Sequence, residues 1–456
     1  MTIDTPSTHT ICINHIEYDT EKLAAFHPGG PLFVELFDGQ NATDAFHSYH
    51  RRAFPHEKMV KYKSLVQKNT QRKTILRIKC DEDEDEDEDD DDDNDHYNHY
   101  HDTQYKTQMD PEYQELCRKI QHILPIHKSF APWHYYIKVG CLSVVALYTE
   151  YRIHVYGAYN WYYMAFLGWI FALIGLNIQH DANHGAVSKY FWVNRILGMS
   201  QNWIGGSAID WMHQHVVQHH IHCNEVHDDP DIMGNLLLRL NPLKPILSIH
   251  MFQYIYLFAL LCLFGLSYSV DSIIHNFYKK NHTNYSRLLH PYMIYEKYFS
   301  IACLSRWIIL PFFFTKESWI MSMLQIIPLF AVGGFYLAFF FILSHNYHGV
   351  YKYNRKVSSL GFFRKQVLTS SNVGGPWLAF INGGLNYQIE HHLFPRIHHS
   401  HYPLIAPYVR QFCEKKYITY THFPSIIENL RSCMKHLHIM GTLHGPPLFF
   451  VKEKND

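Results

Sequence analysis

Two stretches of the chain are uncharged and long enough to cross a lipid bilayer, for which about 20 apolar residues are needed. They cover residues 161–179 and 318–344. Three other apolar stretches are ambiguous and cover residues 133–156, 245–270 and 298–314. The first of these carries charges near its ends, the second is uncharged but amphipathic, and the third has Arg306 in its middle. The pattern predicts an all-α region that spans a membrane several times.

A run of acidic residues divides the chain into two parts. Residues 81–95 hold fourteen Asp or Glu and no base. Such a run cannot bury apolar surface, so we expect a disordered linker over residues 71–110. Before it, residues 8–70 are short for an unaided core and would gain stability from a cofactor. After it, we expect the membrane region over 111–440 and a C-terminal tail over 441–456.

Composition adds three constraints. Outside the acidic run, 40 Lys and Arg face 27 Asp and Glu, which suits a protein held against anionic lipid headgroups on the cytosolic side. Nine cysteines lie scattered from Cys12 to Cys433 without a CxxC pair, which argues against a disulfide framework or a zinc ribbon. The 36 histidines in 456 residues exceed the usual share several-fold and indicate a protein that handles metal, membrane or both.

Histidines gather in three clusters, at residues 179–184, 213–220 and 385–403. In the first cluster, QHDANH, His180 and His184 are four residues apart on one face of a helix, so both can coordinate the same metal ion. In the second, HQHVVQHH, His215 and His219 repeat that spacing. The neighbouring His220 points elsewhere, which suits a bridge between two metal centres.

The third cluster, LNYQIEHHLFPRIHHSHYP, adds the adjacent pair His391 and His392. Seven imidazoles are too many for one tetrahedral zinc, which closes with four ligands, so two metals are implied. Nitrogen ligands without thiolates fit iron, and open positions would allow oxygen to bind. A single cluster of this kind could consist of side chains at the membrane surface that bind no metal. Three clusters on one predicted face of the membrane indicate a metal site.

Clusters that share one metal site must emerge on the same face of the membrane, so an even number of crossings separates them. Three apolar stretches lie between the second and third clusters, and one of them must not cross. We assign 245–270 to the membrane interface, and 298–314 with 318–344 to a hairpin. The alternative is that 298–314 lies flat because of Arg306.

The N-terminal part carries three linked motifs: His27 in HPGG, a NATDAF turn, and a histidine four residues past the phenylalanine of that turn. Together they resemble the cytochrome b5 family, in the form fused to lipid desaturases. The resemblance implies a small α+β haem domain with His27 and His50 as axial ligands, and His47 as a disfavoured competitor. A haem with both axial positions filled carries electrons. One departure is Asn41, where the family usually has Asp.

The three histidine boxes follow a fixed order: HxxxH, then HxxxHH followed by IHCNEVHDDPD, then QxxHH in GGLNYQIEHHLFPR. This order resembles the front-end fatty-acid desaturases, and the resemblance covers nearly the whole chain outside the linker. It implies a cytosolic di-iron site with the ligands His180, His184, His215, His219, His220, His345, His391 and His392. His348 is the fallback for His345. Gln388 is implied to be either a weak oxygen ligand or a group that orients the substrate.

The remaining histidines, such as His222, His398, His399 and His401, are assigned structural or supporting roles.

The resemblance implies an O2-dependent enzyme that inserts a cis double bond between the carboxyl end and the existing double bonds of polyunsaturated acyl chains. The motifs look most like algal delta-4 enzymes, which convert 22:5 to 22:6, with delta-5 or delta-6 enzymes next. Implied cofactors are haem b and two non-haem irons. Implied partners are NADH-cytochrome b5 reductase, an acyl-lipid or acyl-CoA substrate, O2 and the bilayer, without nucleic acid. The substrate tail is expected between 161–179 and 318–344.

Two other classes of protein are considered. A b5-fused sphingolipid desaturase or hydroxylase would share the haem and the di-iron site. A membrane-anchored haem electron carrier would not explain three histidine clusters. The N-terminal MTIDTPSTHT has neither a cleavable signal nor a transit pattern, and Lys452 and Lys454 resemble a dilysine retrieval signal. We therefore expect the endoplasmic-reticulum membrane, with both termini and the active site cytosolic.

Overall fold

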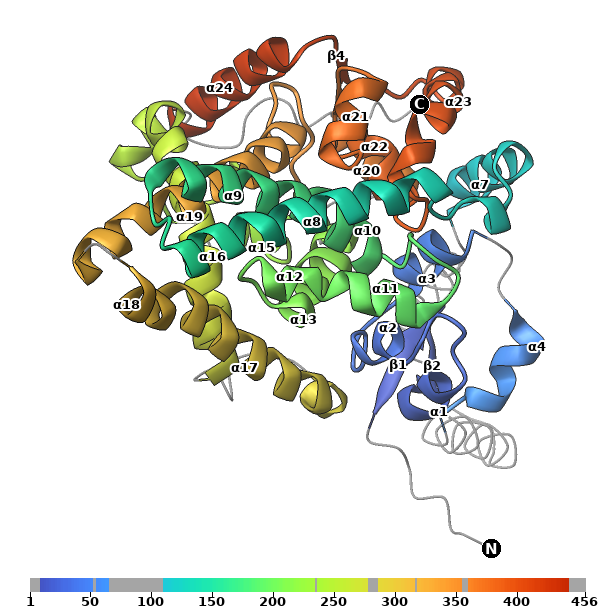
Figure 1. Cartoon of the computed structure of the whole chain (residues 1–456). Helices are drawn as coiled ribbons and strands as arrows, with labels where there is room; N and C mark the ends of the chain where they lie inside the picture. Colours follow the sequence, from blue (N-terminus) through green and yellow to red (C-terminus); the bar gives the residue numbers. More distant parts are fainter. Residues whose placement is uncertain are drawn as a thin grey trace, which may run out of the picture. The chain divides into compact units, whose positions relative to one another are not determined.

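A computed structural model describes residues 9–51, 55–64, 110–233, 236–277, 286–315, 318–354 and 360–442. The acidic run and the dilysine lysines lie outside these residues. The chain divides into two compact units (Figure 1). The first comprises Met1–Arg118 with Ser286–Leu289, and the second comprises Lys119–Tyr285 with His290–Asp456.

The first unit is a small α+β domain. Its strands β1 (Thr10–Ile13) and β2 (Ile16–Asp19) form an antiparallel hairpin. The hairpin turns at Asn14 and His15, both with positive φ, as the right-handed twist of paired strands favours. The helical elements that follow are α1 (Thr20–Ala25), α2 (Leu32–Glu35), α3 (Thr43–His50), α4 (His56–Met59) and η1 (Val60–Tyr62).

The second unit is almost wholly helical and begins with α7 (Pro111–Ile123), which straddles the division between the units. As far as the first two histidine clusters its elements are η2 (Ile126–Lys128), α8 (Trp133–Tyr156), α9 (Trp161–Ile174), η3 (Gly175–Gln179), α10 (His180–Asn183), α11 (Phe191–Gly198), α12 (Ser200–Trp203), α13 (Ala208–Trp211), η4 (Met212–His219) and α14 (His220–His222). Both η3 and η4 are π-helical.

The remaining elements lead to the third histidine cluster and beyond it. They are α15 (Pro230–Met233), η5 (Ser248–Phe252), α16 (Gln253–Phe277), η6 (Arg287–Leu289), α17 (His290–Leu304), η7 (Ser305–Ile309), α18 (Leu310–Phe314), α19 (Trp319–His345), α20 (Phe362–Leu368), β3 (Asn372–Val373), α21 (Pro376–Asn382), α22 (Gln388–Leu393), η8 (His399–His401), α23 (Tyr402–Lys415), β4 (His422–Phe423) and α24 (Ile426–Thr442). Strands β3 and β4 pair in parallel.

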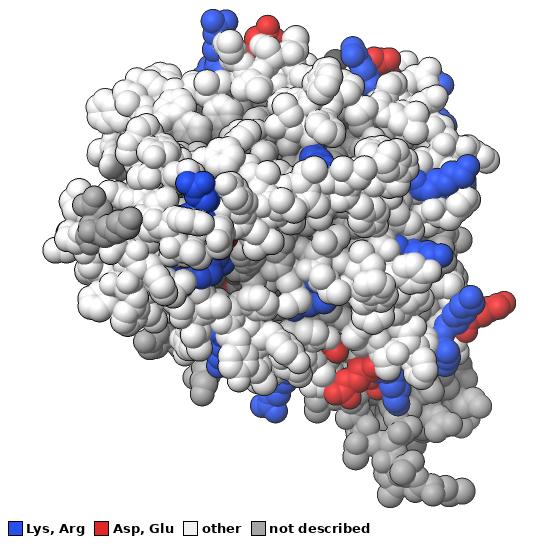
Figure 2. Space-filling view, in the orientation of Figure 1, with Lys and Arg blue, Asp and Glu red and all other residues white. Residues whose placement is uncertain are grey.

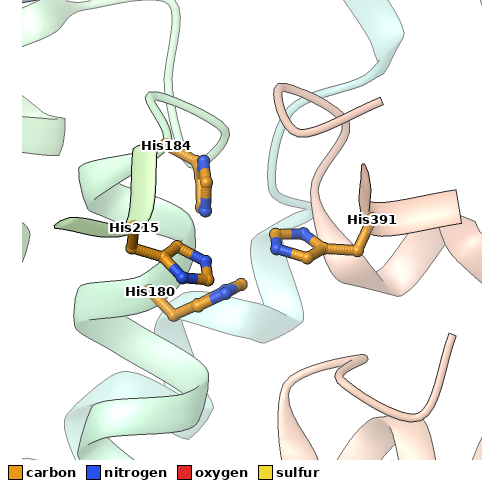
Figure 3. Close-up of side chains that lie close together, drawn as sticks. All are labelled: His180, His184, His215 and His391. Carbon is orange, nitrogen blue, oxygen red and sulfur yellow. The ribbon is translucent and has the colours of Figure 1, made fainter. Parts of the chain in front are cut away.

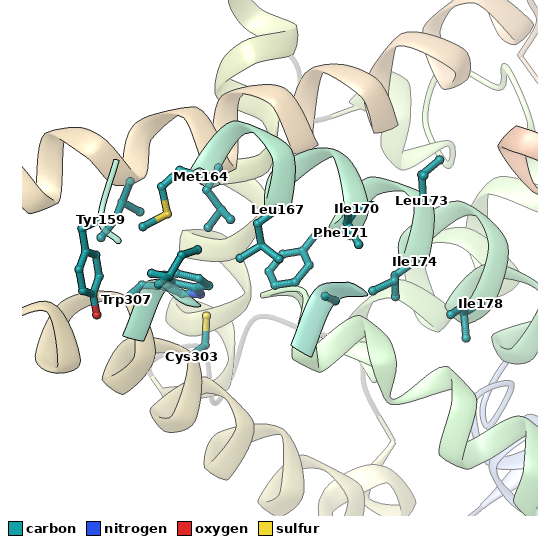
Figure 4. Close-up of a cluster of buried hydrophobic side chains, with 14 residues drawn as sticks. Tyr159, Met164, Leu167, Ile170, Phe171, Leu173, Ile174, Ile178, Cys303 and Trp307 are labelled. Atoms are coloured by element: carbon teal, nitrogen blue, oxygen red, sulfur yellow. The ribbon is translucent and has the colours of Figure 1, made fainter. Parts of the chain in front are cut away.

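Helix α19 is the axis of the second unit, and α9 and α16 both pack along it. Glycines allow the backbones to approach: a Cβ at Gly333 would lie 2.9 Å from the carbonyl oxygen of Gly168, and a Cβ at Gly334 would overlap the backbone nitrogen of Gly265. Figure 4 shows the apolar core on α9, where Met164, Leu167 and other buried side chains pack together. Small residues at such crossings are typical of helix packing in membranes.

Four helical stretches among the described residues are long and apolar enough to cross a membrane: Trp161–Asn183, Ser248–Phe277, Arg287–Phe314 and Trp319–His345. The spans expected at 161–179 and 318–344 are among them. The stretch 133–156 forms α8 but is not in this set. Most of the side chains on the face shown in Figure 2 are uncharged, with single Lys and Arg side chains scattered among them.

The stretch 245–270, expected in the membrane interface, forms η5 and most of α16, which is apolar enough to cross. Its ends, however, both contact elements near the histidine clusters. The side chain of Gln253 donates to the carbonyl of Leu437 in α24, at 2.7 Å, and His275 lies 3.0 Å from Asp210, five residues before His215. The length and apolar character of α16 argue against the interfacial assignment. The contacts at its two ends argue for it, so the assignment remains a prediction.

Replacing Gly334 by valine tests the α16–α19 crossing. The new side chain would overlap the backbone of α16, so we expect the free energy of unfolding to fall by about 1–3 kcal/mol. The measurement is the thermal unfolding midpoint of the detergent-solubilised protein. Gly140→Ala on α8 is the control, because a Cβ there meets nothing within 4 Å. An unchanged midpoint for Gly334→Val would show that the helices do not cross at this position.

Candidate di-metal site and haem pocket

Four histidines from all three clusters converge in a first group, comprising His180, His184, His215 and His391. One ring nitrogen from each lies within 4.8 Å of the others, and all four residues are buried (Figure 3). His180 begins α10, and the helix ends at His184 because Gly185 takes a positive φ. The structure therefore places these four sequence-predicted residues together, in a geometry that could hold one metal ion.

A second group contains His219, His345 and His392, together with Cys223. Its ligand atoms also lie within 4.8 Å of one another, and all four residues are buried. His345 is the last residue of α19, and His392 lies in α22. Of the sequence-predicted metal residues, only His220 belongs to neither group.

The π-helix η4 decides how the second cluster is shared. We expected His215 and His219, four residues apart, to act as a pair, whereas the structure places them in different groups. In a π-helix hydrogen bonds span five residues, and the backbone N–H of His220 indeed donates to the carbonyl of His215. The Nε2 atoms of His215 and His220 lie 3.2 Å apart, while His219 belongs to the second group.

His220 lies between the two groups, as its predicted bridging role requires. Its Nε2 is 3.0 Å from that of His391 in the first group. Its ring stacks on His392 of the second group, with the ring centroids 4.4 Å apart.

A glycine turn brings the third cluster to the first. Gly383 and Gly384 both have positive φ, and a Cβ at Gly383 would overlap the carbonyl of Leu176 in η3. Asn177 secures the contact by donating to the carbonyl of Ile381 at 2.8 Å. The turn before α22 therefore packs directly on the π-helix that precedes His180.

Outer hydrogen bonds fix the orientation of four imidazoles. The Nδ1 atom of His391 meets the Tyr402 hydroxyl at 3.2 Å, and that of His392 meets Oε1 of Gln366 at 2.9 Å. In the same way, Nδ1 of His345 lies 3.0 Å from the carbonyl of Thr369, and Nδ1 of His219 lies 3.1 Å from a carboxylate oxygen of Asp229. With Nδ1 engaged, Nε2 is the atom left for a metal.

The inner nitrogens match what a metal ion needs. Among the described residues, neither ring nitrogen of His180 has a hydrogen-bond partner, and neither does Nε2 of His219. Burial, followed by the neighbouring imidazoles, holds the pKa of His215, His220, His391 and His392 well below the ordinary value. Neutral imidazole is the form that coordinates metal. These residues therefore fit a pair of bound metal ions.

His219 is the exception in charge. Burial alone would lower its pKa, but the carboxylates of Asp229 and Asp231 raise it to about 9. A metal bound at Nε2 would replace the proton that this ring otherwise carries.

Gln388 reaches the second group. Its Nε2 lies 2.9 Å from Nε2 of His345 and 3.4 Å from Nε2 of His392, and its Oε1 has no hydrogen-bond partner among the described residues. Because the two ends of an amide are interchangeable by a flip, the oxygen can take the inward position. The fallback residue His348 is part of neither group.

Sequence reasoning missed Cys223 and the outer partners of the histidines. The Cys223 sulfur lies 3.2 Å from Nδ1 of His345, on the opposite ring edge from Gln388. Burial raises the pKa of this thiol well above its ordinary value. The motif IHCNEVHDDPD contained Cys223, Asp229 and Asp231, and could have signalled them.

Two histidines assigned supporting roles form a third buried cluster, in which His398 and His399 surround Asp181. Asp181 accepts a hydrogen bond from His399 and lies 3.4 Å from Nε2 of His398. The cluster joins the helix that carries His180 to the segment after α22.

In the first unit, the rings of His27 and His50 meet edge to face, with their centroids 5.9 Å apart. Their Nδ1 atoms lie 3.0 Å from the carbonyl of Gly30 and 2.7 Å from that of Phe46, an arrangement that directs Nε2 towards a metal. A Cβ at Gly29 would lie 2.9 Å from the His27 ring. The pair therefore fits axial ligation of a haem iron.

The competitor His47 is buried, with its Nε2 3.1 Å from the Asn14 side chain, away from this pair. Asn41 keeps the local role that a carboxylate would have, because its side-chain oxygen accepts from the backbone N–H of Thr43 at 3.0 Å.

Comparison with known proteins agrees with both sites. The model of the family "Fatty acid desaturase" matches residues 156–424, and that of the "Cytochrome b5-like Heme/Steroid binding domain" matches residues 4–68. An acyl-lipid (7-3)-desaturase of Rebecca salina is 36% identical over 93% of this chain and 89% of its own length. An acyl-lipid (7-3)-desaturase of Diacronema lutheri is 37% identical over 94% of this chain and 89% of its own length. A delta(5) fatty acid desaturase of Dictyostelium discoideum is 25% identical over 93% and 89%. The chain belongs to the fatty acid desaturase family, as a front-end member with a cytochrome b5-like domain at its N-terminus.

Proposed function

We propose that this oxidoreductase is a delta-4 front-end desaturase that converts 22:5 to 22:6 acyl chains, using O2 and electrons passed through its own haem domain. The observation that carries the proposal is the convergence of eight buried histidines in two groups joined by His220. The likeness to acyl-lipid (7-3)-desaturases supports the position of the new bond. We read these numerals as an existing double bond at carbon 7 and a new one three carbons nearer the carboxyl.

We propose that one iron is held by His180, His184, His215 and His391, and the other by His219, His345 and His392, with His220 between them. When bound, the two irons supply the O2-derived oxidant that removes hydrogen from two neighbouring methylene carbons, which no side chain can do alone. The protein's part is to hold neutral nitrogens inward and to exclude water from the buried site.

Gln388 is proposed as the oxygen ligand of the second iron. Its position beside His345 and His392 supports this role over that of a substrate-orienting group. An amide oxygen is a weaker ligand than imidazole, so it leaves a position that exchanges readily.

The haem proposal rests on His27 and His50, whose rings lie next to each other in the first unit. A haem with both axial positions filled transfers electrons singly, and NADH-cytochrome b5 reductase is the proposed source. We retain the boundaries 8–70 for the haem domain, 71–110 for the linker, 111–440 for the membrane domain and 441–456 for the tail.

We further propose that the enzyme resides in the endoplasmic-reticulum membrane with its histidines on the cytosolic face. In this topology the stretch 298–314, which holds the end of α17, η7 and α18, forms a hairpin across the bilayer with α19, while 245–270 lies in the membrane interface. The contacts of both ends of α16 near the histidine clusters support it.

Expression in yeast tests the regiochemistry. Cells are fed separately with 22:5, 20:4 and 18:3 omega-3 acids, and their lipids are analysed by gas chromatography and mass spectrometry. We expect a new 22:6 peak. A 20:5 or 18:4 peak would keep the enzyme class but replace delta-4 by delta-5 or delta-6. If no acid changes while the protein holds haem and iron, a sphingolipid desaturase or hydroxylase becomes the better assignment.

Replacing His391 by alanine tests the metal site. The change removes one nitrogen from the first group and leaves the first unit untouched, so we expect desaturation to be abolished and haem content to persist. Iron analysis should give about two non-haem irons per haem in the parent and fewer in the variant. His127→Ala, at an exposed histidine, is the control. Retained activity in His391→Ala would refute the three-cluster site, and haem without other iron in the parent would favour the electron carrier.

Substitutions at Gln388 distinguish its two roles. If it ligates iron, Gln388→Leu should lower the non-haem iron content, and Gln388→His should retain it by supplying an imidazole. If it orients substrate, both variants should keep their iron, and the position of the double bond should change instead. Iron content and product analysis on the same preparations separate the outcomes.

A further inference from the structure

A lysine is buried next to the second group of histidines. Lys352 follows the turn at the end of α19, where Gly349 has a positive φ, and only 6% of Lys352 is exposed. Its segment pairs with the one that follows η4 and α14. The N–H of Val226 donates to the carbonyl of Tyr353 at 3.1 Å, and the N–H of Tyr353 donates to the carbonyl of Asn224 at 3.4 Å. This pairing places Lys352 beside Asn224.

The side-chain nitrogen of Lys352 has three oxygen acceptors. It lies 2.6 Å from Oδ1 of Asn224, 2.8 Å from Oδ1 of Asn346 and 2.9 Å from the carbonyl oxygen of His345. All three of these partners are buried. A lysine Nζ can therefore use every one of its hydrogens here without any contribution from water.

The orientation of both amides is fixed by their other ends. Nδ2 of Asn224 donates to the carbonyl of Thr369 at 3.0 Å, and Nδ2 of Asn346 donates to the carbonyl of Ile342 at 3.1 Å. The oxygen of each amide must then face Lys352. Three acceptors require three N–H groups, and only the ammonium form of lysine has three. The buried group is therefore a cation.

Asn224 connects this cation to two imidazoles of the second group. Its backbone N–H donates to Oδ2 of Asp229 at 2.6 Å, and the other oxygen of that carboxylate lies 3.1 Å from Nδ1 of His219. Its side chain donates to the carbonyl of Thr369, which lies 3.0 Å from Nδ1 of His345. One residue thus contacts the outer partner of both rings.

Helix capping explains only part of this arrangement. A cation near the end of α19 is favourable for the helix dipole, and the carbonyl of His345 needs a donor because the helix ends there. Capping does not account for the bond to Asn224, which belongs to a different segment. A buried charge also gives up its hydration, which is costly unless its hydrogen bonds replace it. The link to Asn224 is the part of the arrangement that reaches His219.

We infer that Lys352 is a positioning residue, which acts through Asn224 to direct His219 and His345 towards the second metal ion. The inference rests on the proposed assignment of these two histidines to that ion. An outer partner that fixes the ring of a ligand raises the affinity for the metal. Lys352 should therefore strengthen metal binding at the second group and leave the first group unaffected.

Replacing Lys352 by methionine tests the inference, because methionine keeps an unbranched side chain of similar length without a donor. The full-length protein is stripped of non-haem metal and titrated with Co²⁺ alone, and bound cobalt is measured by equilibrium dialysis. His392→Ala identifies the binding step that belongs to the second group. We expect Lys352→Met to weaken that step about 10- to 100-fold and to leave the other step at its parental affinity.

A spectroscopic signature accompanies the loss of affinity. The electron paramagnetic resonance spectrum of bound Co²⁺ is recorded with the haem kept in its reduced, diamagnetic state. We expect Lys352→Met to change the signal of the second ion only. A residue that merely stabilises the fold would weaken both steps together and leave the spectrum of each bound ion unchanged.

Asn224→Gly is the second variant. The backbone of Asn224 has a φ of 65°, which glycine adopts without strain, so the change removes the amide and keeps the backbone bond to Asp229. We expect the same binding step to weaken. Because both side chains act through one link, the double variant Lys352→Met/Asn224→Gly should bind no more weakly than the more affected single variant. If Lys352→Met does not accumulate, Asn224→Gly still tests the link.

Lys435→Met, at an exposed lysine of α24, is the matched control and should keep both binding steps. Parental affinity for the second ion in the variants that accumulate, or equal weakening of both steps, would overturn the inference. A parent that binds fewer than two Co²⁺ ions would instead refute the proposed pair of metal groups, so the two failures are distinguishable.

Discussion

The inward direction of the imidazole Nε2 atoms is the constraint on which the rest of the second unit depends. A hydrogen bond at Nδ1 fixes an imidazole so that Nε2 on its other edge faces a metal. Here the holders come from separate segments: Asp229 after η4, Gln366 of α20, Thr369 after α20, and Tyr402 at the start of α23. Each of these segments must therefore fold against the histidine that it orients, which explains why the connections between apolar helices are themselves packed and buried.

The helical scaffold satisfies this constraint through close backbone approach. Gly333 and Gly334 let α9 and α16 come against α19, so the helical segments ending in His184 and His345 emerge near each other. The paired glycines before α22 do the same for the third cluster by docking on η3. Association in a bilayer cannot rely on excluding water from apolar surface, so contact between backbones takes on a larger share of the packing.

Sequence spacing was enough to select the histidines that the structure brings together and the two most apolar spans. It paired His215 with His219 on the assumption of an α-helix, whereas in η4 the backbone hydrogen bond spans five residues, from His220 to His215. No spacing rule could find Gln366 or Thr369, because they lie far along the chain from the rings they orient. The sequence also could not predict what the ends of α16 contact. Hydropathy shows only that the stretch is apolar, whereas the structure shows Gln253 bonded to Leu437 and His275 beside Asp210.

Buried carboxylates lie beside three of the histidines in the two groups. Imidazole and amide ligands are neutral, so a pair of divalent ions would leave its charge uncompensated in a dry site. Asp181 beside His180, Asp229 behind His219 and Glu390 beside His391 are all nearly inaccessible to solvent. Burial raises the pKa of Glu390 to about 7, even though it accepts hydrogen bonds from Asn372 and Tyr420 at 2.7 Å and 2.8 Å. Cations bound at the histidines would favour its ionised form, so the buried carboxylates are groups that could offset part of that charge.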